Sequence, residues 1–373
     1  MMNNEEALKK LSDGELLRLK KIVENKEAKY NNEQLVRKVQ LNSAYGAVGC
    51  SYFRFFDIRQ AEAITLTGQM SIRWVTNAIN KFLNQIVEVE EDHDFAVAGD
   101  TDSCYLSLGP LVEQECDEDA TRDDIVDFLD KFADESLQPV ILKAYQEFAL
   151  YLNSREQVMD MDREVIADHA IWTAKKRYAM NVLDSEGVRH DTPELEIKGI
   201  ETTRSSTPEV CRNSLKEAIR IALNGGETEL QEFVKDTRKD FFALPPEDVS
   251  FPRGANKLKK YADKKTIYKK GTPIAVRGAL LYNDQIDKLG LGDRYEKVQS
   301  GEKVKFCYLT LPNVLKEDVI SYVGQIPPEF GVHDYVDYQT QWEKAFIDPL
   351  QKILDVIGWN HKKIQTLEDF FGG

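Results

Sequence analysis

The sequence predicts an α+β fold built from roughly two to three structural units. Its 373 residues are 42% hydrophobic, which is enough for a globular chain with a sizeable core. Segments with helical periodicity lie at both ends, and strand-like segments lie between them. This order favours subdomains wrapped around a central sheet.

The N-terminal part is expected to be helical. Residues 5–29 favour a helix, in which Ser12 and Glu15 have the spacing of a capping box. A second helix is predicted over residues 32–48 and a third, longer one over residues 57–84. The core candidates of this third helix are Ile64, Trp74, Val75, Ile79 and Phe82.

The remaining elements follow from turn, cap and periodicity signals. The predicted elements are a hairpin over 95–108, a helix pair over 121–153 whose second member opens at Pro139, strands over 156–200 with a turn at 184–187, a helix from 206 to 225, a helix from 227 to 244, a strand over 303–311 and a helix over 338–357. No internal repeat and no low-complexity tract is found.

Composition narrows the function classes. No apolar run is long enough to span a membrane, and the N-terminus does not have the form of a signal peptide. Five widely spaced cysteines without a CxxC pair predict free thiols in a reducing compartment, and we expect a cytoplasmic location. The five histidines are scattered, which disfavours a histidine-based metal site.

Charge is unevenly distributed along the chain. The net charge of −15 argues against indiscriminate nucleic-acid binding by the whole surface. Residues 253–277 are basic, however, and Tyr261 and Tyr268 lie among their lysines. Such a stretch could follow a phosphate backbone, and a solvated basic loop is the alternative.

Two acids in the predicted hairpin form the first candidate site. Asp100 and Asp102 crowd into the turn between two short strands, where a bend can aim both carboxylates at one volume. Like charges that close require a cation, and oxygen ligands suit Mg²⁺ or Mn²⁺. Paired ions of that kind serve phosphoryl transfer. An ordinary Asp-rich turn is the alternative.

A helix face forms the second candidate site. Lys38, Asn42, Tyr45 and Gly49 are spaced so that they share one face of the second predicted helix. Lysine can bind a triphosphate, and tyrosine offers a flat surface to a base. Gly46 would allow a flat ligand to approach the backbone. An amphipathic helix with a solvated lysine is the alternative.

Three stretches taken together resemble motifs of the family B DNA polymerases. Lys38-Val-Gln-Leu-Asn-Ser-Ala-Tyr-Gly46 resembles the Kx₃NSxYG motif, Asp100-Thr-Asp-Ser103 the DTDS motif and Lys175-Lys-Arg-Tyr178 the KKRY motif. They occur in the order found in the family. The resemblance covers almost the whole chain, is strongest over residues 29–208, and is closest to the T-even-type phage replicative members.

The resemblance implies a partial right-hand polymerase fold without the exonuclease and N-terminal domains. Residues 1–50 would be the C-terminal half of the fingers, 51–205 part of the palm, and 206–373 the thumb with a clamp-binding tail. The activity implied is two-metal nucleotidyl transfer from a dNTP to a primer 3′-hydroxyl, with two Mg²⁺ ions, or Mn²⁺ in their place.

The resemblance also assigns roles to residues. Asp102 would bind both metals, Asp100 would adjust their coordination, and Glu164 would be a further acid near them. Lys176 would contact the primer terminus and tune the active site. The implied nucleotide-binding residues are Lys38, Asn42, Tyr45 and Gly46. The implied DNA-binding residues are Lys175, Lys176, Arg177, Tyr178, Lys259, Lys260, Lys264, Lys265 and Arg277.

One element of the family pattern is missing from this sequence. The two-metal site needs a second aspartate from a DxxSLYPS-like strand, and the sequence contains no Tyr-Pro dipeptide. The opposite helix of the fingers is missing as well. We therefore expect the C-terminal subunit of a split enzyme that begins naturally at Met1. A separate N-terminal chain would supply the exonuclease and the first catalytic aspartate.

The C-terminus suggests a further partner. Leu367, Phe370 and Phe371 form a short apolar tip that resembles the tail by which phage polymerases bind their sliding clamp, although this chain ends in two glycines. Packing of the tip on the thumb is the alternative. Two rival functions also remain open, namely a non-catalytic DNA- or clamp-binding remnant and a phosphatase or nuclease that uses the aspartate pair.

Overall fold

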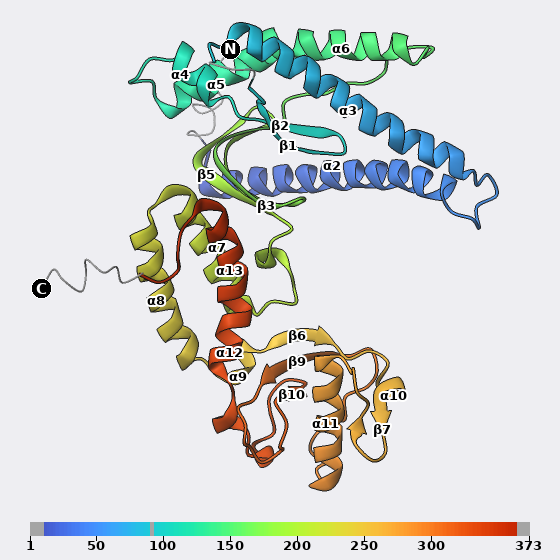
Figure 1. Ribbon diagram of the computed structural model, residues 1–373, viewed down its shortest axis with the longest axis vertical. Helices are drawn as coiled ribbons and strands as arrows, with labels where there is room; N and C mark the ends of the chain where they lie inside the picture. Colours follow the sequence, from blue (N-terminus) through green and yellow to red (C-terminus); the bar gives the residue numbers. More distant parts are fainter. Residues whose placement is uncertain (1–10, 90–92, 364–373) are drawn as a thin grey trace, which may run out of the picture. The chain divides into compact units, whose positions relative to one another are not determined.

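The computed structural model describes residues 11–89 and 93–363. The chain divides into two compact units. Unit 1 consists of Met1–Thr121 and Lys131–Asp162, and unit 2 of Arg122–Asp130 and Arg163–Gly373. Figure 1 labels the helices and strands of both units. The fold is a mixed α+β arrangement, as predicted.

Unit 1 contains long helices and one β-hairpin. Its elements are α2 (Asp13–Val48), α3 (Ile58–Ile86), β1 (Ala96–Asp100), β2 (Ser103–Leu106), α4 (Gly109–Glu115), the π-helical turn η1 (Ala133–Leu137) and α6 (Gln138–Tyr151). The hairpin predicted over residues 95–108 is confirmed.

A single helix, α2, replaces the two helices predicted over residues 5–29 and 32–48. No glycine or proline interrupts the expected junction, and the Lys29–Glu33 ion pair (3.8 Å) bridges it on the helix surface. The predicted capping box is confirmed at the start of α2. The Ser12 N–H donates to Glu15 Oε2 (2.9 Å), and the Ser12 hydroxyl donates to the same oxygen (2.7 Å).

Helix α3 supplies the core of unit 1. Its buried stripe runs along one face at intervals of four residues and consists of Ser71, Val75, Ile79 and Leu83. The predicted core position Ile64 is wrong, since its side chain is 53% exposed. Trp74 packs beside Phe148 of α6, with ring centroids 5.6 Å apart. As predicted, Pro139 lies at the start of α6, but α6 continues directly from the π-helical turn η1 (Ala133–Leu137) with no break between them.

Unit 2 begins with a helix and a three-stranded sheet. The elements of this first part are α5 (Arg122–Phe132, of which residues 122–130 belong to unit 2), β3 (Val165–Ala174), β4 (Arg177–Ser185), β5 (Val188–Lys198), the 3₁₀ turn η2 (Glu201–Thr203), α7 (Glu209–Asn224) and α8 (Glu227–Ala243). The antiparallel strand order is β3-β4-β5. Central strand β4 is buried along most of its length, with Ala179 packing against Ile219 of α7 and Leu183 against Val126 of α5.

The rest of unit 2 surrounds a second three-stranded sheet. Its elements are α9 (Pro246–Val249), β6 (Phe251–Gly254), α10 (Leu258–Tyr261), β7 (Ala262–Asp263), β8 (Ile267–Tyr268), α11 (Ile274–Lys288), β9 (Lys303–Tyr308), β10 (Val319–Tyr322), η3 (Pro328–Phe330), η4 (His333–Tyr335), α12 (Tyr338–Trp342), the π-helical turn η5 (Glu343–Ile347) and α13 (Asp348–Ile357). The sheet order is β10-β9-β6, and α11 packs against it.

In unit 2, the elements with clear cap, turn or periodicity signals in the sequence were predicted correctly. The helices predicted over 206–225, 227–244 and 338–357 are confirmed, as are the strand at 303–311 and the turn at 184–187. The strands predicted from residue 156 begin only at Val165. Helix α11 and strands β6 and β10 were not predicted.

Two composition arguments can be compared with the structure. All five cysteines are free thiols. None of the helices within residues 11–89 and 93–363 has an apolar stretch long enough to cross a bilayer.

Candidate active site

The DTDS hairpin is a tight two-stranded turn in unit 1. Gly99 pairs with Cys104, and Asp100 pairs with Ser103, so Thr101 and Asp102 form the connection. Asp100 Oδ1 accepts hydrogen bonds from the Thr101 N–H (2.8 Å) and hydroxyl (3.1 Å). The first carboxylate is thus oriented by the turn itself, while Asp102 is exposed.

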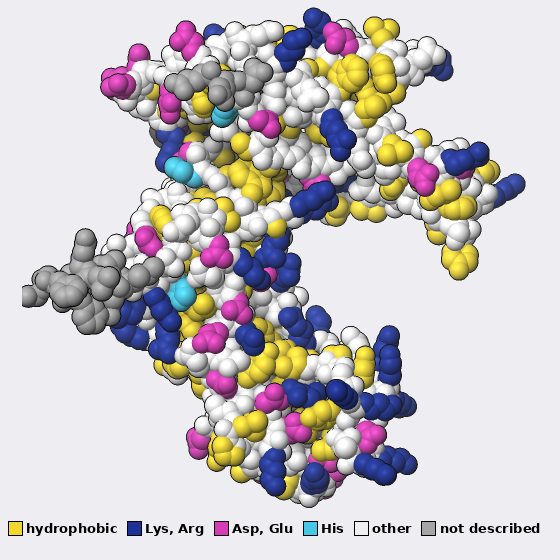
Figure 2. Space-filling view, viewed as in Figure 1, with side chains coloured by type: hydrophobic (Ala, Val, Ile, Leu, Met, Phe, Trp, Pro, Cys, Tyr) yellow, Lys and Arg dark blue, Asp and Glu magenta, His cyan; other side chains and the backbone are white. Residues whose placement is uncertain are grey.

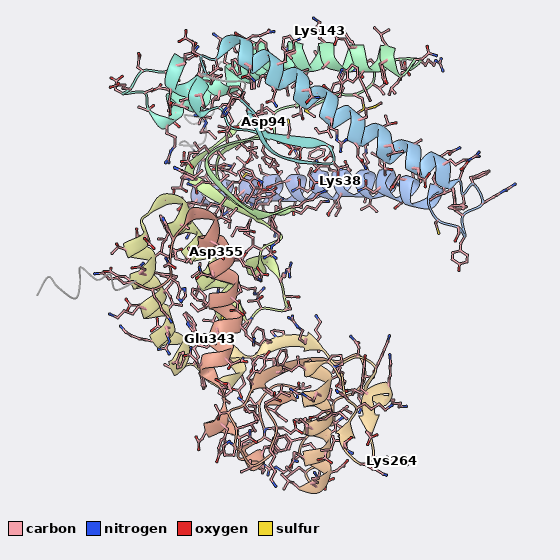
Figure 3. All side chains as sticks on the ribbon, in the orientation of Figure 1. Lys38, Asp94, Lys143, Lys264, Glu343 and Asp355 are labelled. Carbon is pink, nitrogen blue, oxygen red and sulfur yellow. The ribbon has the colours of Figure 1, made fainter. Side chains whose placement is uncertain are left out.

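Helix α3 holds the base of this hairpin. Asn80 Oδ1 accepts the Phe95 N–H (3.1 Å), and Asn80 Nδ2 donates to Asp94 Oδ1 (2.7 Å). Figure 3 labels Asp94 at this end of the hairpin. Phe95 is fully buried, and the half-buried Cys104 thiol bonds to Thr76 of α3. Burial raises the pKa of Cys104, which therefore packs as a neutral thiol. The hairpin is anchored at its base and presents its acidic turn outward.

The predicted nucleotide-binding residues lie in the last part of α2. Lys38, which is labelled in Figure 3, and Asn42, Tyr45 and Gly46 are all exposed. A Cβ built on Gly46 has no heavy atom within 4 Å in the part of the chain that the structure describes. Packing among the described residues gives no reason for a glycine at this helical position, and close approach by a ligand stays a prediction.

The KKRY stretch lies at the β3–β4 turn of unit 2. Ala174 pairs with Arg177, so Lys175 and Lys176 form the turn, and Arg177 and Tyr178 begin β4. Arg177 and Tyr178 do not lie on a sheet edge, because β4 is the central strand of its sheet. Lys176 has a left-handed backbone conformation, with φ of +61°.

Glu164 directly precedes β3 and is exposed, and its carbonyl accepts the Glu186 N–H at 2.7 Å. This backbone contact places Glu164 beside the turn between β4 and β5. Its role near the metals stays a prediction, because the hairpin aspartates belong to unit 1 and Glu164 belongs to unit 2.

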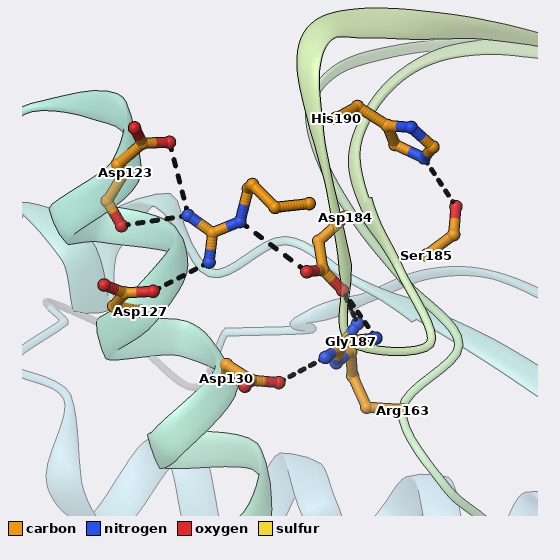
Figure 4. A network of polar contacts seen from close by, with 9 residues as sticks. Asp123, Asp127, Asp130, Arg163, Asp184, Ser185, Gly187 and His190 are labelled. Atoms are coloured by element: carbon orange, nitrogen blue, oxygen red, sulfur yellow. Dashed lines mark hydrogen bonds and ion pairs between the residues drawn. The ribbon is translucent and has the colours of Figure 1, made fainter. Parts of the chain in front are cut away.

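An ion network around the buried Asp184 in unit 2 contains two arginines, Arg163 and Arg189, that were not predicted from the sequence (Figure 4). Asp184 is 4% exposed and accepts hydrogen bonds from Arg163 and from the Gly187 N–H (2.9 Å). Arg189 lies 3.6 Å from Asp184 and also pairs with Asp127 of α5 (2.7 Å). Burial raises the pKa of Asp184, but the Arg163 and Gly187 hydrogen bonds and the charges of both arginines outweigh it and lower that pKa overall.

This network is structural. Asp184 is compensated by arginines, and Arg163 also pairs with Asp130, so the group joins α5 to the β4–β5 hairpin. The charges of its aspartates and arginines compensate one another. No spacing rule could have found it, because its members are brought together only by the fold.

The basic segment of unit 2 presents its lysines outward. Figure 2 shows Lys and Arg side chains gathered over the region of α10 and β7, and Figure 3 labels Lys264 there. Asp263 Oδ1 accepts the N–H groups of Lys265 (2.8 Å) and Thr266 (3.0 Å) and so shapes the turn. The exposed lysines of this surface are Lys257, Lys259, Lys260, Lys264, Lys265, Lys269 and Lys270.

Arg277 differs from those lysines. Its Nη2 lies 2.6 Å from Asp318 Oδ1, and its guanidinium lies over the ring of Tyr268. Unlike the lysines of this surface, Arg277 therefore already has an ion partner within the described residues.

The donor set of the hairpin suits a hard cation, since two carboxylates come from one turn. Among the described residues, no group of three or more His, Cys, Asp or Glu side chains is arranged to hold a metal ion. That the hairpin forms part of a metal site stays a prediction. The clamp-binding residues Leu367, Phe370 and Phe371 lie outside the described residues.

Comparisons with known proteins support the motif assignment. Residues 16–117 match the model of DNA polymerase family B. This segment includes most of α2 and the whole DTDS hairpin. Over this segment the chain therefore matches DNA polymerase family B.

Two phage relatives are similar to nearly the whole chain, and together with the family match they support a T-even-type family B polymerase assignment. The chain is 35% identical over 355 residues to the DNA-directed DNA polymerase of Enterobacteria phage T4, covering 92% of this chain and 39% of the relative. It is 36% identical over 381 residues to the DNA-directed DNA polymerase of Escherichia phage RB69, covering 98% of this chain and 41% of that relative. The chain thus spans about two fifths of the length of these relatives.

Proposed function

We propose that this chain carries the nucleotidyl-transfer site of a DNA-directed DNA polymerase for phage DNA replication. The single observation that supports this most is the anchored DTDS hairpin, with Asp102 exposed at its turn. Similarity to two phage polymerases over nearly the whole chain favours this function over a phosphatase or a nuclease.

The proposed mechanism uses the residues assigned from the family motifs. Asp102 and Asp100 would hold two Mg²⁺ ions, or Mn²⁺, with Glu164 as a further acid. Bound ions of this kind lower the pKa of a hydroxyl and stabilise charge on a leaving pyrophosphate. Lys38 would bind the triphosphate of the dNTP, and Asn42, Tyr45 and Gly46 would contact the nascent base pair. Lys176 would orient the primer terminus.

The DNA would be held by sequence-independent contacts. The KKRY residues would lie at the primer terminus, and Lys259, Lys260, Lys264, Lys265 and Arg277 would contact the product duplex. Backbone contacts of this kind position a duplex without reading its sequence. We retain residues 1–50, 51–205 and 206–373 as proposed fingers, palm and thumb, and Leu367, Phe370 and Phe371 as the proposed contact to a sliding clamp.

We further propose that a separate N-terminal chain completes the site. Helix α2 has no buried residue, and apolar side chains such as Leu17 (71% exposed) and Leu41 (74%) face outward. Within the described residues, the β1–β2 hairpin pairs with no further strand. The exposed apolar side chains of α2 and the two open strand edges both suit a partner that brings a helix and a strand. That strand would carry the first catalytic aspartate.

Primer extension tests the catalytic assignment. Asp102→Ala should reduce Mg²⁺-dependent incorporation by at least about 100-fold, because it removes a group that stabilises developing charge. Asp119→Ala is the matched control, since Asp119 is an exposed carboxylate of the same unit. Full activity of Asp102→Ala would refute the assignment. If the completed enzyme binds primer-template DNA but makes no product, the rival function of a non-catalytic DNA- or clamp-binding remnant would be favoured.

A further inference from the structure

The β3–β4 turn carries a strained backbone that other residues must hold. Lys175 and Lys176 connect Ala174 to Arg177, and Lys176 has φ of +61°. Residues with a side chain rarely adopt this left-handed conformation, and it persists where the surroundings determine it. The residues around the turn therefore determine the backbone position from which the Lys176 side chain extends.

Gly199 is the first of these supports. It follows β5, has φ of +68°, and a Cβ on it would lie 2.1 Å from the Lys176 carbonyl oxygen. The same atom would lie 3.2 Å from Arg177 Cγ. Only glycine allows this close approach, so the backbone of the turn rests directly on residue 199.

Glu201 is the second support. Its Oε2 accepts a hydrogen bond of 2.6 Å from Arg177 Nη2, and the two side chains are 16% and 25% exposed. Charge-assisted bonds between partly buried groups are stronger than neutral ones. Arg204 also lies near Glu201 (3.9 Å) and donates to the Gly199 carbonyl (3.4 Å). Glu201 is therefore fixed beside the segment that supports the turn.

We infer that Glu201 is a positioning residue that holds the Lys175–Lys176 turn through Arg177. Arg177 Nε has no hydrogen-bond partner in the described part of the chain, so loss of the Glu201 charge would leave a partly buried guanidinium poorly compensated. The turn would then loosen, and Lys176 would lose its defined position. The consequence for catalysis rests on the proposed polymerase function, whereas the consequence for the turn does not.

Hydrogen exchange measured by mass spectrometry tests the structural step. Glu201→Gln should accelerate amide exchange in the peptide that covers residues 174–178 by about tenfold, because one charge-assisted bond is lost. Glu201→Asp keeps the charge and should show a smaller acceleration. Glu194→Gln, at a carboxylate of β5 that is 70% exposed, should show none. Unchanged exchange in Glu201→Gln, or equal acceleration throughout unit 2, would overturn the inference.

A kinetic cycle tests the functional step. In primer extension, Glu201→Gln should slow incorporation about tenfold and add little on a Lys176→Ala background, since both changes act on one lysine. Fully additive losses would overturn the positioning role. If the wild-type enzyme, completed by its partner, makes no product, the proposed function fails, and the exchange experiment still decides the role of Glu201.

Discussion

At the scale of the residue, Asp100 and Asp102 have different surroundings although only one residue separates them. Thr101 fixes Asp100 Oδ1 through its N–H and its hydroxyl, while Asp102 is exposed at the turn. An oriented acid and an accessible acid suit the two roles implied by the family, with Asp102 as the direct ligand and Asp100 as the adjuster.

Gly46 provides a test of ligand approach to α2. Gly46→Ala should leave stability unchanged or raise it by up to about 1 kcal/mol, because alanine favours a helix and the site has room for a Cβ. The KM for dNTP should nevertheless rise, since the added methyl group would meet the nascent base pair. Thermal melts and single-nucleotide kinetics measure the two effects.

Gly68→Ala is the matched control for that experiment. Gly68 lies within α3, and a Cβ there also has nothing within 4 Å in the described structure. The substitution should stabilise the helix to a similar degree without changing KM. An unchanged KM in Gly46→Ala would show that the glycine does not serve the nucleotide.

At the scale of the element, the Asp184 network joins α5 to the β4–β5 hairpin. Asp184→Asn should destabilise unit 2 by about 2 kcal/mol at pH 7, because the partly buried Arg163 and Arg189 lose one charged partner and keep only Asp130 and Asp127. Asp191→Asn, at an exposed position of β5, is the control and should have little effect.

The pH dependence of stability gives a second readout for Asp184. Its folded-state pKa lies below the ordinary value of 3.8, so its contribution is present above that value and is lost as the pH falls through the folded pKa. Wild-type stability should therefore fall in this acid range, and Asp184→Asn should show a flatter profile. Parallel acid profiles of the two proteins would contradict the role of the network.

Amide exchange of helix α2 tests the proposed N-terminal partner. Because α2 buries none of its residues, its amides should exchange rapidly in the isolated chain. Addition of an N-terminal chain that bears the opposite helix should protect them. Helix α3, with its buried stripe, should be protected in both states. Slow exchange of α2 in the chain alone would argue against the open surface.

Sequence patterns predicted the elements with strong local signals and missed those defined by tertiary contacts. The capping box at Ser12 and the caps of α7 identified helix ends, whereas the long exposed α2 was divided where no residue breaks it. Ile64 has helical spacing but no element covers it. Helix α11 was not predicted because it follows a basic segment, although seven of its residues are buried.

The candidate site shows the same limit. The motif residues Asp102, Lys38 and Lys176 could be assigned from the sequence because the family places them in short contiguous patterns. The supports of those residues could not. Glu201 is 24 positions from Arg177, and no local signal predicts their ion pair.

At the scale of the whole molecule, the protein is acidic but carries one basic surface. The net charge is −15, yet the lysines around β7 and β8 are exposed together. Binding of the completed enzyme to primer-template DNA should weaken with salt. Lys264→Ala/Lys265→Ala should reduce the slope of log K against log[salt] by roughly 2, measured by fluorescence anisotropy.

Lys288→Ala is the control for the salt experiment, because Lys288 of α11 already pairs with Asp284 at 2.6 Å. Its slope should match that of the wild-type protein. A slope in Lys264→Ala/Lys265→Ala equal to wild type would show that the basic surface does not contact the backbone.

The central claim is that the DTDS hairpin is one part of a metal site that a second chain completes. Primer extension with this chain alone, with an N-terminal polymerase chain alone, and with both together tests it most directly. We predict no synthesis by either chain and Mg²⁺-dependent synthesis by the pair. Robust extension by this chain alone would contradict the claim.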